Sequence, residues 1–228
     1  MFHKVCYDEL KEIMMIKITE KIIETGLPVK LGILTADVQV KPSCDNILAL
    51  LDEQVQRVKA FTLENYRNES LEASRDIYKK LGKDPSRYRI SSDSLFRRLI
   101  KDKGMYHVNN VVDINNIISL KTLWSVGAYD LDKVEGHILY GVGADEVYEG
   151  IGRGILNIKN LPVLKDDLGP FGSATSDSLR TMVTEDTKRV LMVIHAFGTG
   201  EGLEDALKDM KSYLAAYAYA ENVHTEII

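Results

Sequence analysis

The stretch "NNVVDINNIISLKTLWSVGAYDLDKVEG", residues 109–136, changes its pattern halfway along. Residues 110–122 place Val, Ile and Leu at helical spacing, which predicts a helix. From Leu123 onward the chain becomes β-like and richer in Gly, and a strand is expected near 124–129. Because helices and strands follow one another without an internal repeat, the α+β class is favoured.

Short polar side chains interrupt the apolar helix of this stretch. Asn109, Asp113 and Asn116 stand at positions i, i+4 and i+7, so they share one face of the helix. Asn and Asp compete for backbone hydrogen bonds and are poor residues for a helix interior. One interpretation is a pocket for a polar, uncharged group. The other is that Asn109 caps the helix while Asp113 and Asn116 bond to a neighbouring loop.

Predicted elements continue on both sides of the stretch. On the N-terminal side we expect an amphipathic helix over 7–25, a strand over 27–40, a helix-rich region over 45–82 and a helix over 93–103 capped by Ser92. On the C-terminal side we expect strands near 137–142, 147–151, 161–165, 178–183 and 188–196, and a last helix over about 203–220. These elements predict an N-terminal helical extension over 1–26 and one domain over 27–228.

The composition is that of an ordinary globular protein, with 45% hydrophobic and 28% charged residues in 228. No apolar run approaches the roughly 18–20 residues needed to cross a bilayer. The first residues mix charge through their apolar pattern, which is unlike a signal peptide. Cys6 and Cys44 have no paired spacing, which fits a reducing compartment. We therefore expect a cytoplasmic protein.

The charge is unevenly distributed along the chain. The net charge is −5, yet residues 75–104 hold ten basic and four acidic residues, which gives +6 and leaves −11 for the remainder. Such a segment is able to face phosphates. The alternative is that its Lys and Arg side chains cover the solvated faces of two helices.

The sequence holds no motif that identifies a reaction. The five His residues have no metal-ligand spacing, and "GTGEG" (198–202) lacks the rest of a nucleotide-binding pattern, so no metal or cofactor is expected. Hydroxyl residues that include Ser176 and Thr181 gather around Arg180. They fit a loop beside a strand edge, or a site where a fixed cation holds a carboxylate or a phosphate.

Linked motifs across residues 78–143 are more specific than any of these patterns. They comprise Leu81-Gly82, "PSRYR" (85–89), Ser91-Ser92 before a helix with Arg97-Arg98, "VVD" (111–113) with Asn116, and "GAYDLD" (127–132). In order and spacing they resemble the B3/B4 domain of the phenylalanyl-tRNA synthetase β subunit, and more closely the free-standing proteins built from that domain. Weaker similarity extends over about 60–210. The resemblance implies a three-layer, α/β/α-like fold that contains a β-sandwich of unusual topology.

In the synthetase this domain carries the editing site, which hydrolyses tyrosine wrongly esterified to phenylalanine tRNA. By that resemblance, hydrolysis would use a positioned water, with no catalytic side chain in this sequence. The implied substrate pocket is formed by Asn109, Asp113, Asn116, Gly127, Tyr129, Ser176, Arg180 and Thr181. The implied tRNA-facing residues are Arg87, Arg89, Arg97, Arg98 and Lys101. The chain is not expected to be a complete tRNA ligase.

Two departures from the synthetase pattern concern the amino-acid site. Gly127 stands where the synthetase commonly has a His, and Arg153 or Gly154 replaces an acidic residue that helps to recognise the tyrosine hydroxyl. The leading hypothesis is a tRNA-binding or aminoacyl-tRNA-binding domain that hydrolyses mischarged aminoacyl-tRNA in trans. The alternatives are a non-catalytic module for a small amino-acid-like ligand and a regulatory protein–protein module. Neither DNA nor a membrane is an expected partner.

Overall fold

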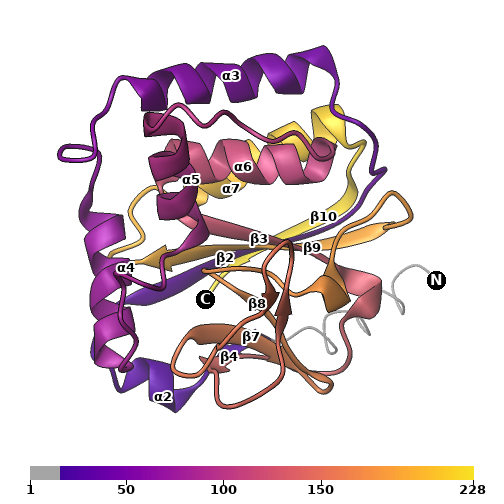
Figure 1. Ribbon diagram of the computed structural model, residues 1–228. Helices are drawn as coiled ribbons and strands as arrows, with labels where there is room; N and C mark the ends of the chain where they lie inside the picture. The colour runs from indigo at the N-terminus through magenta and orange to yellow at the C-terminus, as the bar shows by residue number, and fades with distance from the viewer. Residues whose placement is uncertain (1–15) are drawn as a thin grey trace.

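The computed structural model describes residues 16–228, and its central sheet runs through the middle of the molecule (Figure 1). Its strands lie in the order β10 (Glu221–Ile227), β2 (Val29–Asp37), β9 (Arg189–Phe197) and β3 (Ser125–Asp130), all antiparallel. β9 pairs along its whole length with β2, and its residues 190–195 also pair with β3. Residues 190–197 are buried. A strand buried on both faces reads as a continuous apolar run, as "VLMVIHAF" does.

Helices cover one face of the central sheet. They are α3 (Asp45–Lys59), α5 (Ser91–Ile100), α6 (Asn110–Thr122) and α7 (Leu203–Tyr217), whereas α4 (Glu69–Lys80) lies beside one end of the sheet, at the left of Figure 1, and contacts β9. α6 and α7 lie on the sheet, and α3 lies outside α6, at the top of Figure 1. α6 is enclosed on most sides, which explains why its sequence is apolar around the helix rather than along one stripe.

A second, outer sheet faces the other side of the central sheet. Its strands lie in the order β1 (Ile16–Ile18), β4 (Ile138–Val142), β7 (Pro162–Asp166) and β8 (Gly169–Ser173). The side chains between the sheets interdigitate, and the rings of Tyr129 and Phe171 meet edge to face with centroids 5.0 Å apart. The fold is therefore α+β, with a helical layer on a β-sandwich.

Short elements complete the outer sheet. The helix α2 (Glu20–Ile23) contacts β4, and β5 (Glu149–Gly150) forms a small hairpin with β6 (Gly154–Ile155). None of the helices within residues 16–228 combines the length and hydrophobicity that crossing a bilayer requires.

The prediction of a single helix over 7–25 is wrong over residues 16–18. These residues form β1, which pairs in parallel with β4, and a helix covers only Glu20–Ile23 of the described part. Residues 7–15 lie outside the described region. In so short a segment, Ile16 and Ile18 fit the periodicity of a helix and that of a strand equally well. Pairing with the distant strand β4 makes the segment a strand.

The region 178–183 is also not the predicted strand. Leu179–Thr181 form a short 3-10 helix, begun by the Ser178 side chain, which accepts a hydrogen bond from the Arg180 amide. Ser92 does not cap α5, because the helix starts at Ser91 and the Ser92 hydroxyl donates to the carbonyl of Leu123 at 2.7 Å. Ser92 thus fixes α5 to the connection between α6 and β3.

Candidate functional site: a polar sandwich interior and a basic surface

The polar residues of α6 are held by the chain itself. Asn109 is the N-cap, and its side chain accepts a hydrogen bond from the Val112 amide at 2.9 Å. Asp113 is fully buried and accepts from the Ser43 hydroxyl at 2.6 Å and from the Val108 amide at 3.2 Å. These contacts match the structural interpretation of Asn109 and Asp113. Asn116 is half-buried on the same helix.

Gly127 and Tyr129 lie on β3 and face the outer sheet. The Tyr129 ring occupies a slot between two glycines, since a Cβ atom would lie 1.9 Å from its hydroxyl at Gly127 and 2.3 Å at Gly172. Phe171 meets the ring edge to face. At the end of the slot, the Tyr129 hydroxyl donates to the Asp177 carboxylate at 2.8 Å. The slot is therefore shaped for a phenol and is filled by the chain's own phenol.

Asp177 is the residue of this interior that the sequence patterns did not single out. Burial raises the pKa of its carboxyl to about 7, while the hydrogen bond from Tyr129 opposes that shift. The same burial raises the pKa of the Tyr129 hydroxyl well above its ordinary value, so the phenol remains the donor. The pair stays neutral below about pH 7 and carries one negative charge above it.

Three predicted pocket residues close to Asp177 in the chain, Ser176, Arg180 and Thr181, form hydrogen bonds within the fold. Arg180 donates to both carboxylate oxygens of Asp166, at 2.8 and 3.0 Å, and also to the backbone carbonyls of Lys133 and Gly169. Thr181 is fully buried, and the carbonyl of Ser176 accepts a hydrogen bond from the Tyr148 hydroxyl at 2.6 Å. The Arg180 charge is thus neutralised within the fold.

Further buried polar groups lie deeper in the sandwich. His195 on β9 is 3.2 Å from the Tyr140 hydroxyl through Nδ1, and its Nε2 atom has no hydrogen-bond partner among the described residues. Burial lowers the pKa of His195 to about 3, so its imidazole is neutral at physiological pH. The Tyr78 hydroxyl of α4 is 2.8 Å from the Thr175 hydroxyl.

The structure divides the predicted pocket residues between two places. Gly127, Tyr129, Ser176, Arg180 and Thr181 lie around the space between the sheets, whereas Asn109, Asp113 and Asn116 belong to the helical layer on the other face of the central sheet. A hollow of about 340 Å³ lies elsewhere, beside the start of α7, and is lined by residues that include Lys30, Glu204 and Asp205. Among residues 16–228, no group of three or more His, Cys, Asp or Glu side chains has metal-binding geometry.

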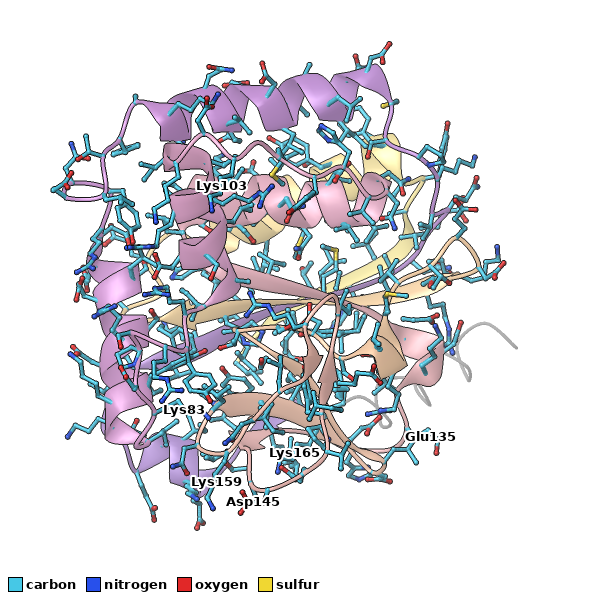
Figure 2. The ribbon with its side chains drawn as sticks, in the orientation of Figure 1. Lys83, Lys103, Glu135, Asp145, Lys159 and Lys165 are labelled. Carbon is cyan, nitrogen blue, oxygen red and sulfur yellow. The ribbon has the colours of Figure 1, made fainter. Side chains whose placement is uncertain are left out.

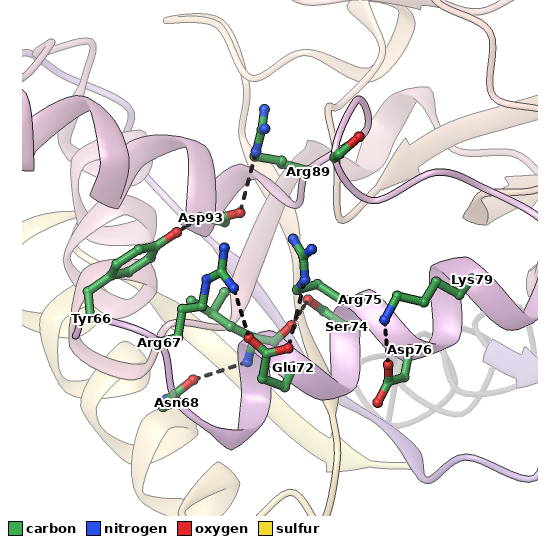
Figure 3. A network of polar contacts seen from close by, with 12 residues as sticks. Tyr66, Arg67, Asn68, Glu72, Ser74, Arg75, Asp76, Lys79, Arg89 and Asp93 are labelled. Carbon is green, nitrogen blue, oxygen red and sulfur yellow. Dashed lines mark hydrogen bonds and ion pairs between the residues drawn. The ribbon is translucent and has the colours of Figure 1, made fainter. Parts of the chain in front are cut away.

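The predicted tRNA-facing residues lie around α5. Figure 3 shows a network in which Arg89 approaches the Asp93 carboxylate at 3.8 Å and Tyr66 donates to the same carboxylate at 2.5 Å. Arg97 donates to the Tyr66 hydroxyl at 3.0 Å. Nearby, Arg67 and Arg75 flank Glu72 at 3.5 and 3.8 Å. The ion pairs of Arg67, Arg75 and Arg89 are longer than hydrogen bonds, so water or a ligand is able to compete for these guanidinium groups.

Of the other three predicted residues, Arg87 precedes α5, and Arg98 and Lys101 lie at its C-terminal end. Arg87 and Lys101 are exposed, and Arg98 is half-buried. Arg98 donates to the carbonyls of Lys103 and Gly104 and lies over the ring of Tyr106, 4.0 Å from its centroid.

A helical layer on a two-sheet sandwich, with the linked motifs on α5, α6 and β3, is consistent with a known domain family. The sequence model of the B3/4 domain matches residues 73–204, more than half of the chain. The chain belongs to the B3/4 domain family. Its family segment includes α5, α6, β3, the outer strands β4, β7 and β8, and β9, so it contains both the slot and the basic surface.

Comparison with solved structures gives a chain of similar structure. It is an N-terminal fragment of the phenylalanyl-tRNA synthetase beta-subunit from Pyrococcus horikoshii, 15% identical, with a TM-score of 0.49. The match covers 92% of this chain and 50% of that fragment, so the present chain spans about half the length of the fragment. Comparison with curated proteins gives no match.

Proposed function

We propose that this B3/4 domain binds tRNA through the basic surface formed by α4, α5 and the segments that follow them. The observation that carries the proposal is the charge of residues 75–104, which is +6 in a chain whose net charge is −5. Phosphate contacts supply most of the affinity of nucleic-acid binding that does not read sequence. On a protein of net negative charge, a local positive surface is better explained by contacts with phosphates than by a contribution to solubility.

Not every basic side chain of residues 75–104 is free to approach a phosphate. Lys83 is buried, donates to the carbonyls of Asn157 and Lys159, and lies 3.8 Å above the Tyr88 ring, so it has a structural role (Figure 2). Exposed basic residues for which the described chain offers no ion pair are Lys80, Arg87, Lys101 and Lys103. These are the side chains best placed to approach phosphates.

Hydrolysis of an aminoacyl ester is a separate step of the proposal. The slot between Gly127 and Gly172 is the part of the interior that would suit a tyrosine side chain, with Asp177 at the hydroxyl. Tyr129 fills that slot, so a tyrosyl group would have to displace it. We therefore propose RNA binding as the primary function, and ester hydrolysis only where the ring of Tyr129 leaves the slot.

The test is the affinity of the purified chain for tRNA, measured by fluorescence anisotropy over a salt series. The double charge reversal Arg87→Glu/Lys101→Glu should weaken binding and reduce the slope of log K against log salt by about 1–2, because two phosphate contacts are lost. The matched control, Lys21→Glu/Lys211→Glu, makes the same change of net charge on α2 and α7. Equal losses in both variants would refute this surface as the binding site.

Release of tyrosine from mischarged phenylalanine tRNA, measured with the same preparation, separates binding from chemistry. Release above the spontaneous rate would show that the slot opens. Absence of both release and salt-sensitive binding would favour the alternative, a module for a small amino-acid-like ligand.

A further inference from the structure

The connection between α5 and α6, residues 101–109, exposes two large apolar side chains. Tyr106 and Val108 are each 62% exposed, and the neighbouring Lys101, Lys103 and His107 are also exposed. The connection runs across the helical layer between α3 and α6 (Figure 1), and Lys103 lies near its start, beside α5, in Figure 2. A ring exposed to this extent contributes little to the core, so its role is sought at the surface.

The ring of Tyr106 is held in place, although it is exposed. The Arg98 guanidinium donates through Nε to the Gly104 carbonyl at 2.8 Å and through Nη2 to the Lys103 carbonyl at 2.7 Å. Fixed in this way, Arg98 covers one face of the ring, 4.0 Å from its centroid. The Val108 amide donates to buried Asp113, which anchors the far end of the connection. One face of the phenol ring is supported, so binding on the other face would order little further structure.

The charge around the ring selects the kind of partner. Arg98 lies over the ring, and Lys101 and Lys103 precede it in the same connection, whereas the one acidic residue of this segment, Asp102, pairs with Lys59 at 2.7 Å. Residues 98–108 therefore carry a charge of +2, three basic residues less one acidic residue. An aromatic face inside a positive surface is the arrangement by which proteins bind single-stranded nucleic acid, with bases stacked on rings and phosphates near Lys and Arg.

We infer that Tyr106, supported by Arg98, is a stacking platform for an unpaired RNA base. The inference rests on the proposed RNA-binding function and assigns it a contact that phosphate attraction alone does not supply. Lys101 and Lys103 neutralise the phosphates on either side of the stacked nucleotide. Since every base has a π-face, the platform is not specific for one base. It requires an unpaired nucleotide, because in a duplex both faces of a base are covered by its neighbours.

The test compares two probes with the same number of phosphates: a short fluorescent oligoadenylate and its abasic counterpart. Tyr106→Ala and Tyr106→Leu should weaken binding of the oligoadenylate by about 5- to 150-fold, whereas Tyr106→Phe should bind like the parent chain. All four proteins should bind the abasic probe equally. Because position 106 is exposed, melting temperatures should agree, and they verify that each variant is folded.

The outcomes separate failure of the platform from failure of RNA binding. If Tyr106→Leu binds the oligoadenylate like the parent chain, while Arg87→Glu/Lys101→Glu weakens tRNA binding, the platform is refuted and the basic surface stands. If the parent chain binds neither oligoadenylate nor tRNA at low salt, the proposed function fails and the platform fails with it. Weakening by Tyr106→Phe equal to that by Tyr106→Ala would assign the effect to the hydroxyl and would overturn stacking.

Discussion

Replacing Asp177 by Asn should remove a specific part of the pH dependence of stability. Asp177 accepts the hydrogen bond of Tyr129 at 2.8 Å at the end of the glycine slot. Burial raises the pKa of its carboxyl from an ordinary value of 3.8 to about 7. Asn has nearly the same shape, keeps an acceptor for the phenol and carries no charge.

The sign follows from proton binding. A carboxyl whose folded pKa lies above its unfolded pKa holds its proton more tightly in the folded state, so its stabilising effect is complete below about pH 4. That stability is lost as the pH rises through the folded value of about 7. Between about pH 6 and about pH 8.5 the loss is about 1.4 kcal/mol. The full shift, whose effect is lost between about pH 4 and about pH 7, corresponds to at most about 4 kcal/mol. Asp177 as a whole is half-buried, and solvent therefore reduces the effect below this upper limit.

Urea unfolding across this pH range, followed by the fluorescence of the single and buried Trp124, gives the measurement. The parent chain should lose up to about 1.4 kcal/mol more than Asp177→Asn as the pH rises. His195 contributes pH dependence of the opposite sign, but it is present in both proteins and cancels in the difference. Asp186→Asn, at an exposed position, controls for the loss of one carboxylate. Parallel stability curves for the parent chain and Asp177→Asn would refute the assignment of Asp177 as the group that titrates.

Two other substitutions test the packing of the site. Asn109→Ala should cost about 1 kcal/mol of unfolding free energy, and Asn109→Ser much less, because Ser also caps a helix; equal costs in urea titrations would contradict the capping role. Gly127→Ala should destabilise the chain by at least about 1–3 kcal/mol, since its Cβ would meet the Tyr129 hydroxyl at 1.9 Å. The cost should shrink in a Tyr129→Ala background, and an unchanged cost would place the clash elsewhere.

Local sequence patterns were sufficient to predict an element where its own residues, rather than pairing with a distant strand, decide its conformation. The helix over 110–122 is confirmed at its stated limits, and the strand expected near 124–129 is observed over Ser125–Asp130. β10 was not predicted, because its sequence "ENVHTEI" is mostly polar and becomes a strand through pairing with β2 at the sheet edge. β8 was not predicted for a similar reason, since "GPFGS" has weak strand propensity and is stabilised by β7.

The site was predicted in part because its contacts are distant in sequence. The shared helix face of Asn109 and Asp113 follows from spacing, but the spacing does not reveal that Ser43, 70 residues before Asp113, bonds to it. Arg180 was expected as a fixed cation for a ligand, and the Asp166 carboxylate already neutralises it. No separate role was predicted for Asp177 within the cluster around Arg180, because its partner, Tyr129, is 48 positions away.

The basic surface and the sandwich interior share one segment of chain, residues 173–177. On the side of the helices, the Ser91 amide at the start of α5 donates to the Ala174 carbonyl at 2.7 Å, and the buried Tyr78 hydroxyl of α4 contacts Thr175. On the interior side, Asp177 ends the same segment and holds Tyr129. A displacement of α5 by a bound polyanion would therefore act on the segment that keeps the phenol in its slot. If the chain binds RNA as proposed, that binding would for this reason be thermodynamically linked to occupancy of the slot.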